Sequence, residues 1–470
     1  MPDRRHGVRW LTLGLTISLL LSTGIGYLVL GGQQGAQLRA AKAGLWAPAI
    51  PVTPTFTDPA PPLAPDGQGG EAATADGVAK AVASLVDDSR FGGKLGLSVV
   101  DVETGKQLYG VRADAQVTPA STTKIVTAAA ALAALGPYHR FATRAVTGEA
   151  PGEVVLIGGG DPTLAVGARG SYPNAARLDQ LAKQVKAAAG TRVTKVIVDS
   201  SLFTGPTIGD GWDATIVAEG YAAPVNALTV NGGRTSPVSS NSSRPTPRTT
   251  TPDIFAGQAF AKLLGAPASS VSVGTAPAGA RELGKIQSAP LQHMVELMLQ
   301  LSDNVIAESL LRQVAVAKGQ PATFEGGQAA VKSILTDLGL DPAGHGLLDG
   351  SGLSRNNRIT PQLLTAILQA TTGPDHAALR GVLAGLPVAA YSGTLAKRFA
   401  GAPVRAAVGE VRAKTGSLAG VSALSGVLVA DSGRQLAFAA ITDGVPRGGE
   451  DAAEARLDRI AAALARCGCS

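Results

Sequence analysis

Three short motifs of the sequence combine hydroxyl, amine and amide groups of the kind that acyl-transfer enzymes use. They are Ser121-Thr122-Thr123-Lys124, Ser302-Asp303-Asn304 and Lys414-Thr415-Gly416. A serine hydroxyl is a poor nucleophile at neutral pH and needs a base beside it. Because none of the three motifs contains a histidine, Lys124 is the natural candidate for the base that activates Ser121.

The residues around Ser121 favour such a pair. Ser121 precedes an Ala- and Leu-rich run, 125–135, that should be helical and that the Gly-Pro pair at 136–137 ends. Lys124 lies three residues after Ser121, so the two side chains share one face of the helix, one turn apart. A lysine acts as a base only when it is neutral. Burial and a second nearby cation, Lys414, would both lower its pKa toward that state.

Taken singly, each motif also has an ordinary structural interpretation. Ser121 could be the N-cap of its helix, and Ser302 could cap the helix that begins near Val305. The third motif could simply end a strand. The context favours catalysis instead, because Ser302 lies between two amphipathic helices and Lys414 follows a Val-containing strand. Lys414 and Thr415 would then match a substrate carboxylate, a cation against an anion.

The same ordered set of motifs occurs in penicillin-binding proteins and class A β-lactamases. The surrounding sequence resembles one branch, the D-alanyl-D-alanine carboxypeptidase/endopeptidase family of low-molecular-mass class C penicillin-binding proteins, which have a domain inserted after the nucleophile helix. The stretches that carry the resemblance, across residues 77–465, are Pro119–Lys124, Gly158–Leu164, Gly211–Asp213, Ala223–Leu228, Ser302–Asn304, Asp349–Asn357 and Lys414–Ser417. The long separation between Ser121 and Ser302 leaves room for the insert, whereas a simple β-lactamase spaces these motifs more closely.

The resemblance implies a reaction in which Ser121 attacks the carbonyl between two D-alanines and forms an acyl-enzyme. Lys124 would take the proton of the serine, and Ser302 would pass a proton to the departing D-alanine nitrogen. The backbone N–H groups of Ser121 and Ser417 would form the oxyanion hole, where one donor typically contributes about 3–4 kcal/mol. The implied substrate is the peptidoglycan stem peptide, the implied inhibitors are β-lactam antibiotics, and no cofactor or metal is implied.

The resemblance also implies a set of substrate-binding residues, which are Asn304, Lys414, Thr415, Gly416, Ser417, Arg355 and Asp213. Asn304 would hold the substrate amide, and Arg355 would contact the peptide stem. Family members that recognise a diaminopimelate side chain use an acid a few residues past a Trp of the insert and a Ser three residues after the Gly of Lys-Thr-Gly. Ile216 and Ala419 stand near those positions here. The side-chain preference therefore stays open, with Asp213 as a possible substitute for the acid.

The hydrophobic pattern predicts an α/β (α+β) chain that contains an inserted α+β domain and is preceded by one transmembrane helix. The resemblance implies that the rest is a β-lactamase/transpeptidase-like domain with an antiparallel sheet between helices. The predicted helices are at 75–87, 125–135, 175–189, 291–301, 305–316 and 451–466. The predicted strands are at 95–102, 107–111, 154–157, 193–198, 410–414, 421–429 and 435–442. Residues 234–252, rich in Ser, Thr, Pro and Arg, bury too little apolar surface to fold and are predicted to be a loop.

The N-terminal end carries a run suited to a membrane. Residues 10–30 are uncharged, are long enough for a bilayer crossing, and follow three arginines at 4, 5 and 9. Basic flanks stay in the cytoplasm, so the bulk of the chain should lie on the cell-wall side of the membrane. Cleavage of this segment as a signal peptide is the alternative. The predicted organisation is a cytoplasmic tail at 1–9, a transmembrane anchor at 10–30, a Pro-rich linker at 31–74, a DD-peptidase domain at 75–141 and 286–466, and an inserted domain at 142–285.

Composition argues against several other classes of function. The formal charge is +6, but residues 1–45 carry +4 of it, so the body of the chain has no basic stripe for nucleic acid. The five histidines are scattered and none lies in a metal-binding signature, so we expect no metal. Cys467 and Cys469 could form a short disulfide or remain idle thiols, and we favour the idle thiols as the simpler interpretation.

Two other functions stay open beside a serine-type D-Ala-D-Ala carboxypeptidase with a possible DD-endopeptidase activity. A β-lactamase-like hydrolase would need a group that activates the deacylating water, yet no Glu is followed by Asn three or four residues later. A non-catalytic cell-wall-binding protein would be expected to have a degenerate site, whereas all three motifs are intact. Both observations favour the peptidase.

Overall fold

The computed structural model describes residues 72–87, 91–238, 245–373 and 375–469. The predicted cytoplasmic tail, the predicted anchor and nearly all of the predicted linker lie outside these residues. Among the residues that are described, no helix combines the length and the apolar character that a membrane crossing needs.

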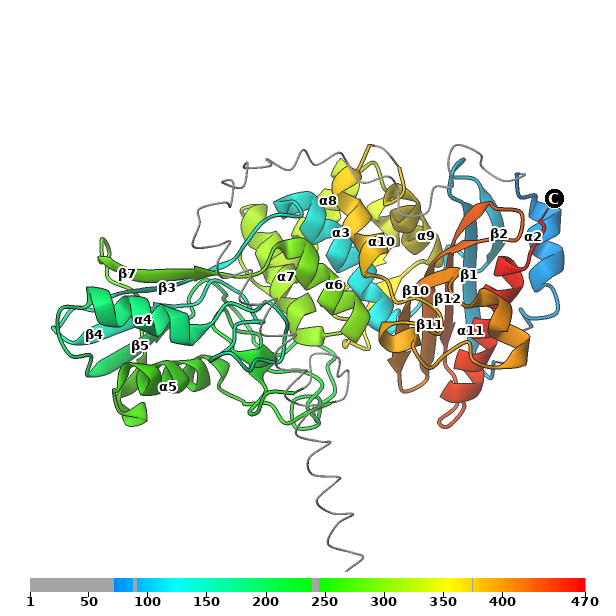
Figure 1. Ribbon diagram of the computed structural model, residues 1–470. Helices are drawn as coiled ribbons and strands as arrows, with labels where there is room; N and C mark the ends of the chain where they lie inside the picture. The colour runs from blue at the N-terminus through cyan, green and yellow to red at the C-terminus, as the bar shows by residue number, and fades with distance from the viewer. Residues whose placement is uncertain (1–71, 88–90, 239–244, 374, 470) are drawn as a thin grey trace, which may run out of the picture. The chain divides into compact units, whose positions relative to one another are not determined.

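Five antiparallel strands form the sheet that carries the third motif, in the order β10-β11-β12-β1-β2 (Figure 1). Their bounds are β1 Lys94–Asp101, β2 Gln107–Val111, β10 Val411–Leu418, β11 Val421–Val429 and β12 Gln435–Asp443. The turn between β1 and β2 forms because the carboxylate of Asp101 accepts the N–H of Thr104 and Gly105 takes a φ of +68°. Strand β10 lies at the edge of the sheet, so one side of the Lys-Thr-Gly motif is not covered by another strand.

The side chains of β11 alternate between the two faces of this sheet, as the pleat requires. Ala423 and Val427 join the core around α3, whereas Leu424 and Leu428 join the core beneath α2 (Ala75–Val82) and α11 (Glu450–Ala465). Figure 1 shows α2 and α11 beside one face of the sheet and α9 beside the other. The sheet therefore has buried residues on both faces.

Helix α3 (Thr123–Leu135) follows the first motif and is surrounded by other helices. Its neighbours are α6 Leu291–Leu301, α7 Asn304–Ala317, α8 Phe324–Asp337, α9 Pro361–Ala370 and α10 Arg380–Gly385. Four consecutive alanines, 128–131, are at most 1% exposed. Small side chains all round α3 let its neighbours pack closely, and close packing fixes the position of Lys124 at its first turn.

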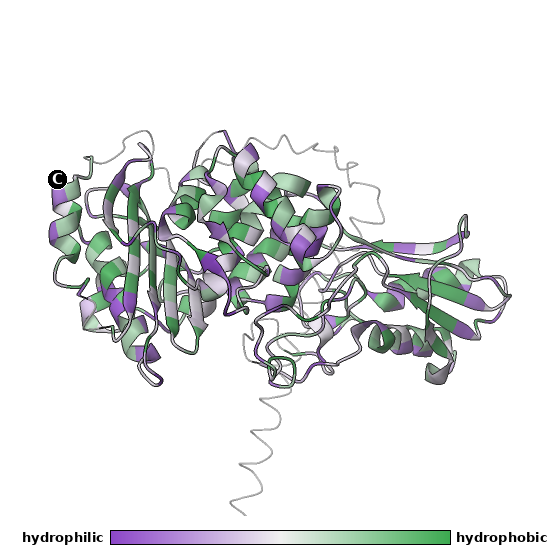
Figure 2. Ribbon diagram, turned by 180° about the vertical axis from the view of Figure 1, so that it is seen from behind, coloured by the Kyte–Doolittle hydropathy of each residue, from purple (hydrophilic) through white to green (hydrophobic). Residues whose placement is uncertain are grey.

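A second, mixed sheet has the order β6-β5-β4-β3-β7 and a hydrophobic core of its own. The elements are β3 Ala142–Thr147, β4 Glu153–Ile157, β5 Lys195–Asp199, β6 Val271–Val273 and β7 Glu282–Gln287, with the helices α4 Leu178–Ala188 and α5 Pro252–Leu264. Strands β4 and β5 are parallel because α4 connects them as a crossover. This sheet is largely hydrophobic, in green in Figure 2. The predicted mixture of helices with an antiparallel sheet is confirmed, and the domain bounds at 142 and 285 stay a prediction.

The remaining elements are short. They are the strands β8 His345–Gly346 and β9 Arg358–Ile359 and the 3-10 turns η2 Ala120–Thr122, η3 Asn231–Gly233, η4 Ala268–Ser270, η5 Pro342–Gly344, η6 Ala377–Leu379, η7 Gly393–Leu395 and η8 Ala402–Ala407.

Cys467 and Cys469 are joined as a disulfide, so the expectation of idle thiols was wrong. The segment that they close lies against the start of α2, where the N–H of Thr74 donates to the carbonyl of Cys469 over 2.6 Å. Cys469 is thus held at the start of α2, with its Cα 4.8 Å from that of Cys467, a separation that a disulfide can span.

Candidate active site

Ser121 lies in the short turn η2 just before α3. The chain bends sharply there, since Ala120 has a φ of +48° and the hydroxyl of Thr123 donates to the Ala120 carbonyl over 2.8 Å. Gly352 packs against the same carbonyl, and a Cβ at Gly352 would lie 1.8 Å from its oxygen. Only glycine fits at that point. Ser121 does not cap the helix, because the N-cap position belongs to Thr122, and the Ser121 hydroxyl instead faces Lys124.

Lys124 joins the first motif to the second. It is fully buried, and its Nζ lies 3.0 Å from the Oγ of Ser121. The same nitrogen lies 2.7 Å from the Oδ1 of Asn304 and 2.6 Å from the carbonyl oxygen of Ser351. The other end of the Asn304 amide donates from Nδ2 to the carbonyl of Tyr221, which fixes the direction in which the amide oxygen points. The amine therefore has three defined polar neighbours.

The surroundings of Lys124 make it a better base than an ordinary lysine. Burial lowers the pKa of Lys124 to about 8, although the charges of Glu308, Asp349 and Asp303 act in the opposite direction. The charge of Lys414, which the sequence suggested as a second cause, is not what lowers it. Burial, with the charges of Lys124 and Arg398 acting in the same direction, also places the pKa of Lys414 well below its usual range.

Ser302 and Lys414 form the second pair of the site. Helix α6 ends at Leu301, and Ser302 takes a left-handed φ of +55°, so that its hydroxyl lies 2.9 Å from the Nζ of Lys414, which donates to it. The cap of α7 is Asp303 and not Ser302, because the carboxylate of Asp303 accepts the first N–H groups of that helix. Strand β10 can approach η2 because residue 416 is glycine. A Cβ there would lie 2.7 Å from the carbonyl oxygen of Pro119.

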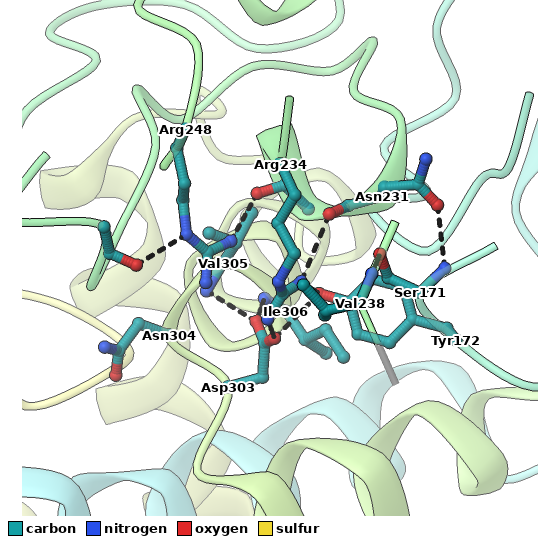
Figure 3. A network of polar contacts seen from close by, with 12 residues as sticks. Ser171, Tyr172, Asn231, Arg234, Val238, Arg248, Asp303, Asn304, Val305 and Ile306 are labelled. Carbon is teal, nitrogen blue, oxygen red and sulfur yellow. Dashed lines mark hydrogen bonds and ion pairs between the residues drawn. The ribbon is translucent and has the colours of Figure 1, made fainter. Parts of the chain in front are cut away.

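Asp303 itself is held by residues from the long segment between the first two motifs (Figure 3). Its Oδ2 accepts from the hydroxyl of Tyr172 over 2.7 Å and from the guanidinium of Arg234 over 3.2 Å. Arg234 also donates to the Tyr172 hydroxyl over 2.7 Å, and Arg248 donates to the carbonyls of Gly220 and Gly232 nearby. Burial would raise the pKa of Asp303, but the charges of both arginines outweigh burial and keep that pKa well below its usual value. The ionised carboxylate fixes the residue between Ser302 and Asn304.

A cleft of about 620 Å³ opens beside these groups. Its lining includes Ser121, Asp213, Ile216, Ser302, Asn304, Arg355, Thr415, Ser417 and Ala419. The buried ammonium groups of Lys124 and Lys414 are not part of that lining, whereas the Thr415 residue next to Lys414 is. Arg355 and Asp213 are close to each other at the cleft, 3.9 Å apart and both about half exposed. Arg355 also donates to the carbonyl of Ala419 over 3.1 Å.

The structure thus brings the predicted site residues together and adds several that the motifs did not reveal. Asp349 accepts from the indole N–H of Trp212 over 2.8 Å and from backbone N–H groups of its own turn, and Glu308 accepts from the same turn. Neither acid was given a role from the sequence. A weak signal was present, since small residues directly follow Asp349 in one of the stretches that carried the resemblance.

Comparisons of the sequence identify the relatives of this chain. The sequence pattern of the D-Ala-D-Ala carboxypeptidase 3 (S13) family matches residues 78–244 and 236–466. A carboxypeptidase of Mycobacterium tuberculosis is 41% identical over 435 residues, which cover 91% of this chain and 92% of that protein. The carboxypeptidase DacB of Mycolicibacterium smegmatis is 39% identical over 431 residues, covering 90% and 91%. A D-alanyl-D-alanine carboxypeptidase of Actinomadura sp. is 30% identical over 520 residues, covering 92% of each.

A solved structure gives the same picture of the fold. Penicillin binding protein 4 of Haemophilus influenzae is similar with a TM-score of 0.67 at 24% identity, covering 81% of this chain and 97% of that chain. That protein has also been solved in complex with a β-lactam, and this second structure is similar with a TM-score of 0.60 at 22% identity. At these identities the likeness concerns the fold, and it supports the mixed arrangement of helices and sheets described above.

Proposed function

This chain belongs to the D-Ala-D-Ala carboxypeptidase 3 (S13) family, and we propose that it removes the terminal D-alanine from peptidoglycan stem peptides through an acyl-enzyme on Ser121. It is a serine-type carboxypeptidase and therefore a hydrolase. One observation carries the proposed mechanism: residues far apart in the chain meet as Ser121–Lys124–Asn304 and Ser302–Lys414 beside one cleft.

The three neighbours of Lys124 support its role as the base. A neutral amine has two hydrogens and one lone pair. The Oδ1 of Asn304 and the carbonyl oxygen of Ser351 are acceptors only, so they take the two hydrogens. The lone pair then remains for the hydroxyl of Ser121, the third neighbour. In this arrangement Ser121 passes its proton to Lys124 while its Oγ forms a bond to the carbonyl carbon between the two D-alanines.

Ser302 and Lys414 then serve the leaving group. The C–N bond of the substrate breaks and the departing nitrogen needs a proton, which we assign to the hydroxyl of Ser302. That hydroxyl accepts a hydrogen bond from the Nζ of Lys414. Lys414 can therefore return a proton to Ser302 after the hydroxyl has given its own proton to the departing nitrogen. Thr415 lines the cleft and is assigned to the terminal carboxylate, with the charge of Lys414 behind it. The N–H groups of Ser121 and Ser417 are assigned to the oxyanion.

The stem peptide would extend past Arg355 and Asp213. Both are half exposed at the cleft, and together they offer one positive and one negative group to a zwitterionic side chain. Ile216 and Ala419, which stand in place of a more polar pair in some family members, also line the cleft. We therefore propose that Asp213 replaces the missing acid, so that a side chain with an amino group is preferred. Cleavage of cross-links as a DD-endopeptidase, and acylation by β-lactams, belong to the same proposal because they use the same Ser121.

We also propose that residues 10–30 anchor the chain in the cell membrane as a single span, with the catalytic part on the cell-wall side. The support is the uncharged run itself, the three arginines that precede it, and a substrate that lies outside the membrane. Protease added to intact cells tests this proposal. It should cut the Pro-rich linker and release the folded body, whereas protection until the membrane is permeabilised would contradict it.

The covalent step can be tested directly. Full-length protein in detergent is incubated with benzylpenicillin and its intact mass is measured. We expect one adduct on the wild type and on Ser201→Ala, an exposed serine that serves as control, and none on Ser121→Ala. Incubation with wall peptides should release D-alanine from pentapeptides, and the same sample containing cross-linked dimers shows whether cross-links are cut. An adduct that persists in Ser121→Ala would contradict the assignment of the nucleophile.

A further inference from the structure

Glu308 is a buried acid beside the site that has no place in the mechanism above. It lies on α7, six residues after Ser302, and is 1% exposed. Its two carboxylate oxygens are used separately: Oε2 accepts the N–H of Gly350 over 2.9 Å, and Oε1 accepts the N–H of Ser351 over 2.8 Å. The acid is thus bound to the Asp349–Gly352 turn, whose Gly352 packs against the carbonyl of Ala120, the residue before Ser121.

The two central peptide groups of this turn, Gly350–Ser351 and Ser351–Gly352, are held at both ends. The carbonyl of Gly350 accepts from the hydroxyl of Thr127 over 2.7 Å, and the N–H of Gly352 donates to the carboxylate of Asp349 over 2.8 Å. The carbonyl of Ser351 accepts from the Nζ of Lys124 over 2.6 Å. A short chain of contacts therefore runs from Glu308 through the turn to the amine of Lys124.

We propose that Glu308 is a positioning residue for Lys124: it fixes the turn whose carbonyl accepts one hydrogen of the amine, and its charge sets the pH at which the amine becomes free to act as a base. The inference rests on the proposed function, since it takes Lys124 as the base. The geometry requires such a residue. If the carbonyl of Ser351 moved away, the amine would turn one hydrogen toward Ser121, and its lone pair would no longer point at the serine hydroxyl.

The pKa values of Glu308 and Lys124 agree with two groups whose protonation states depend on each other. Burial raises the pKa of Glu308 to about 8, with Asp349 acting in the same direction, and burial lowers the pKa of Lys124 to about 8. Two groups that titrate in the same range and act on each other lose their protons in shared steps. The charged or titratable neighbours of the pair, on every element packed against it, are Asp303 and Arg312 of α7, Asp349 of the turn and Lys414 of β10. An ionised Glu308 keeps a proton on Lys124, and a neutral Glu308 releases it.

The test compares Glu308→Gln, Glu308→Asp and the wild type by single-turnover acylation with an uncharged activated ester between pH 6 and pH 10. The wild-type rate should rise with a midpoint near 8. Glu308→Gln has no charge, so its midpoint should fall by about one pH unit, the lower end of the usual effect of a nearby opposite charge. Its plateau should also fall, because the amide offers one acceptor to two backbone N–H groups. Glu308→Asp keeps the charge, so its midpoint should stay while its plateau falls. Glu149→Gln, an exposed acid, should change neither.

Each outcome decides the matter. A Glu308→Gln midpoint equal to that of the wild type would leave Glu308 a purely structural role and overturn the inference, as would a Glu308→Asp midpoint that moves like that of the Gln variant. A wild-type rate without any titration would overturn the base role of Lys124 as well, so the two failures are distinguishable. If Glu308→Gln does not fold, carboxyl NMR of wild-type protein with 13C-labelled glutamate replaces it. One resonance should titrate near 8, and titration of all glutamates near the ordinary value of about 4.3 would overturn the proposal.

Discussion

The base role of Lys124 makes a quantitative prediction about pH. With a pKa of about 8, the amine is about 9% neutral at pH 7 and about 90% neutral at pH 9. An ordinary lysine that titrates near 10.4 would be only about 0.04% neutral at pH 7, so burial provides about 200 times more of the reactive form. Since the pKa of Lys124 is lowered, the active form is gained as the pH rises through 8. The acylation rate should therefore increase about 90-fold between pH 6 and pH 9 and then level off.

The assay needs a substrate without a carboxylate. The pKa of Lys414 is also lowered, so a rising pH removes the positive charge that would attract the carboxylate of a penicillin or a stem peptide. With an uncharged ester, the pH dependence of the acylation rate reports on Lys124 alone. With benzylpenicillin, the acylation rate should first rise and then fall with pH, which gives a bell-shaped profile. A rate that is constant from pH 6 to 9, or that rises only near 10.4, would refute the base role.

Two lysine variants serve as matched controls in that assay. Lys124→Arg should lower acylation by about 100- to 10,000-fold at every pH, the range that general-base catalysis covers, because a guanidinium stays protonated. Lys414→Arg should do far less damage with the uncharged ester, since the charge of Lys414 serves a carboxylate that this substrate lacks. An equal loss in both variants would mean that the two lysines have been given the wrong roles.

Two further predictions concern residues around the cleft. Thr415→Val should raise KM for a peptide ending in D-Ala-D-Ala by about 10- to 100-fold, the value of a hydrogen bond to a charged group, and leave the uncharged ester unaffected, as steady-state kinetics will show. Arg234→Met should lower the free energy of unfolding by about 3 kcal/mol at pH 7, measured in urea, the lower end of the usual cost of breaking a buried ion pair, because Asp303 loses its ion-pair partner and keeps only the charge of Arg248 nearby. The lowered pKa of Asp303 adds stability above its unfolded value near 3.9 that is lost as the pH falls, so the variant should also lose less stability between pH 5 and pH 3.

The elements that the sequence predicted well are those with strong local periodicity. The spacing of Leu291, Met294, Val295 and Met298 placed α6 at its observed bounds, and the β11–β12 hairpin agreed to within one residue. Helix α8 was missed because Gly326 and Gly327 lie in its first turn and weaken the helical pattern. Their absence of side chains has a tertiary cause: a Cβ at Gly327 would lie 2.5 Å from a side-chain carbon of Leu311 on α7. No local signal reports such packing.

The same distinction between local sequence signals and tertiary packing applies to the site residues. The three motifs could be found because each holds its chemistry within three or four residues, and their convergence was expected from a resemblance that required it. Glu308 and Asp349 were missed because they accept from backbone N–H groups of a turn and act through their charge on Lys124, which lies more than 180 residues away from Glu308 along the chain. A lone acid in a helix gives no sign of what its carboxylate will meet. The environment of Lys124, and hence its lowered pKa, follows from that unseen packing.

The segment at 234–252 shows where composition misleads. Its Ser, Thr, Pro and Arg content correctly predicted that it has no regular structure over most of its described residues. It did not follow that its side chains are solvated. Arg234 is only 4% exposed and reaches Asp303, because a charged side chain can be buried when a fixed opposite charge and a phenol, Tyr172, accept its hydrogens. Composition reports whether a segment can build a core of its own. Whether it completes the site of another part of the chain is decided by its partners. Here the partner, Asp303, lies between Ser302, which contacts Lys414, and Asn304, which contacts Lys124.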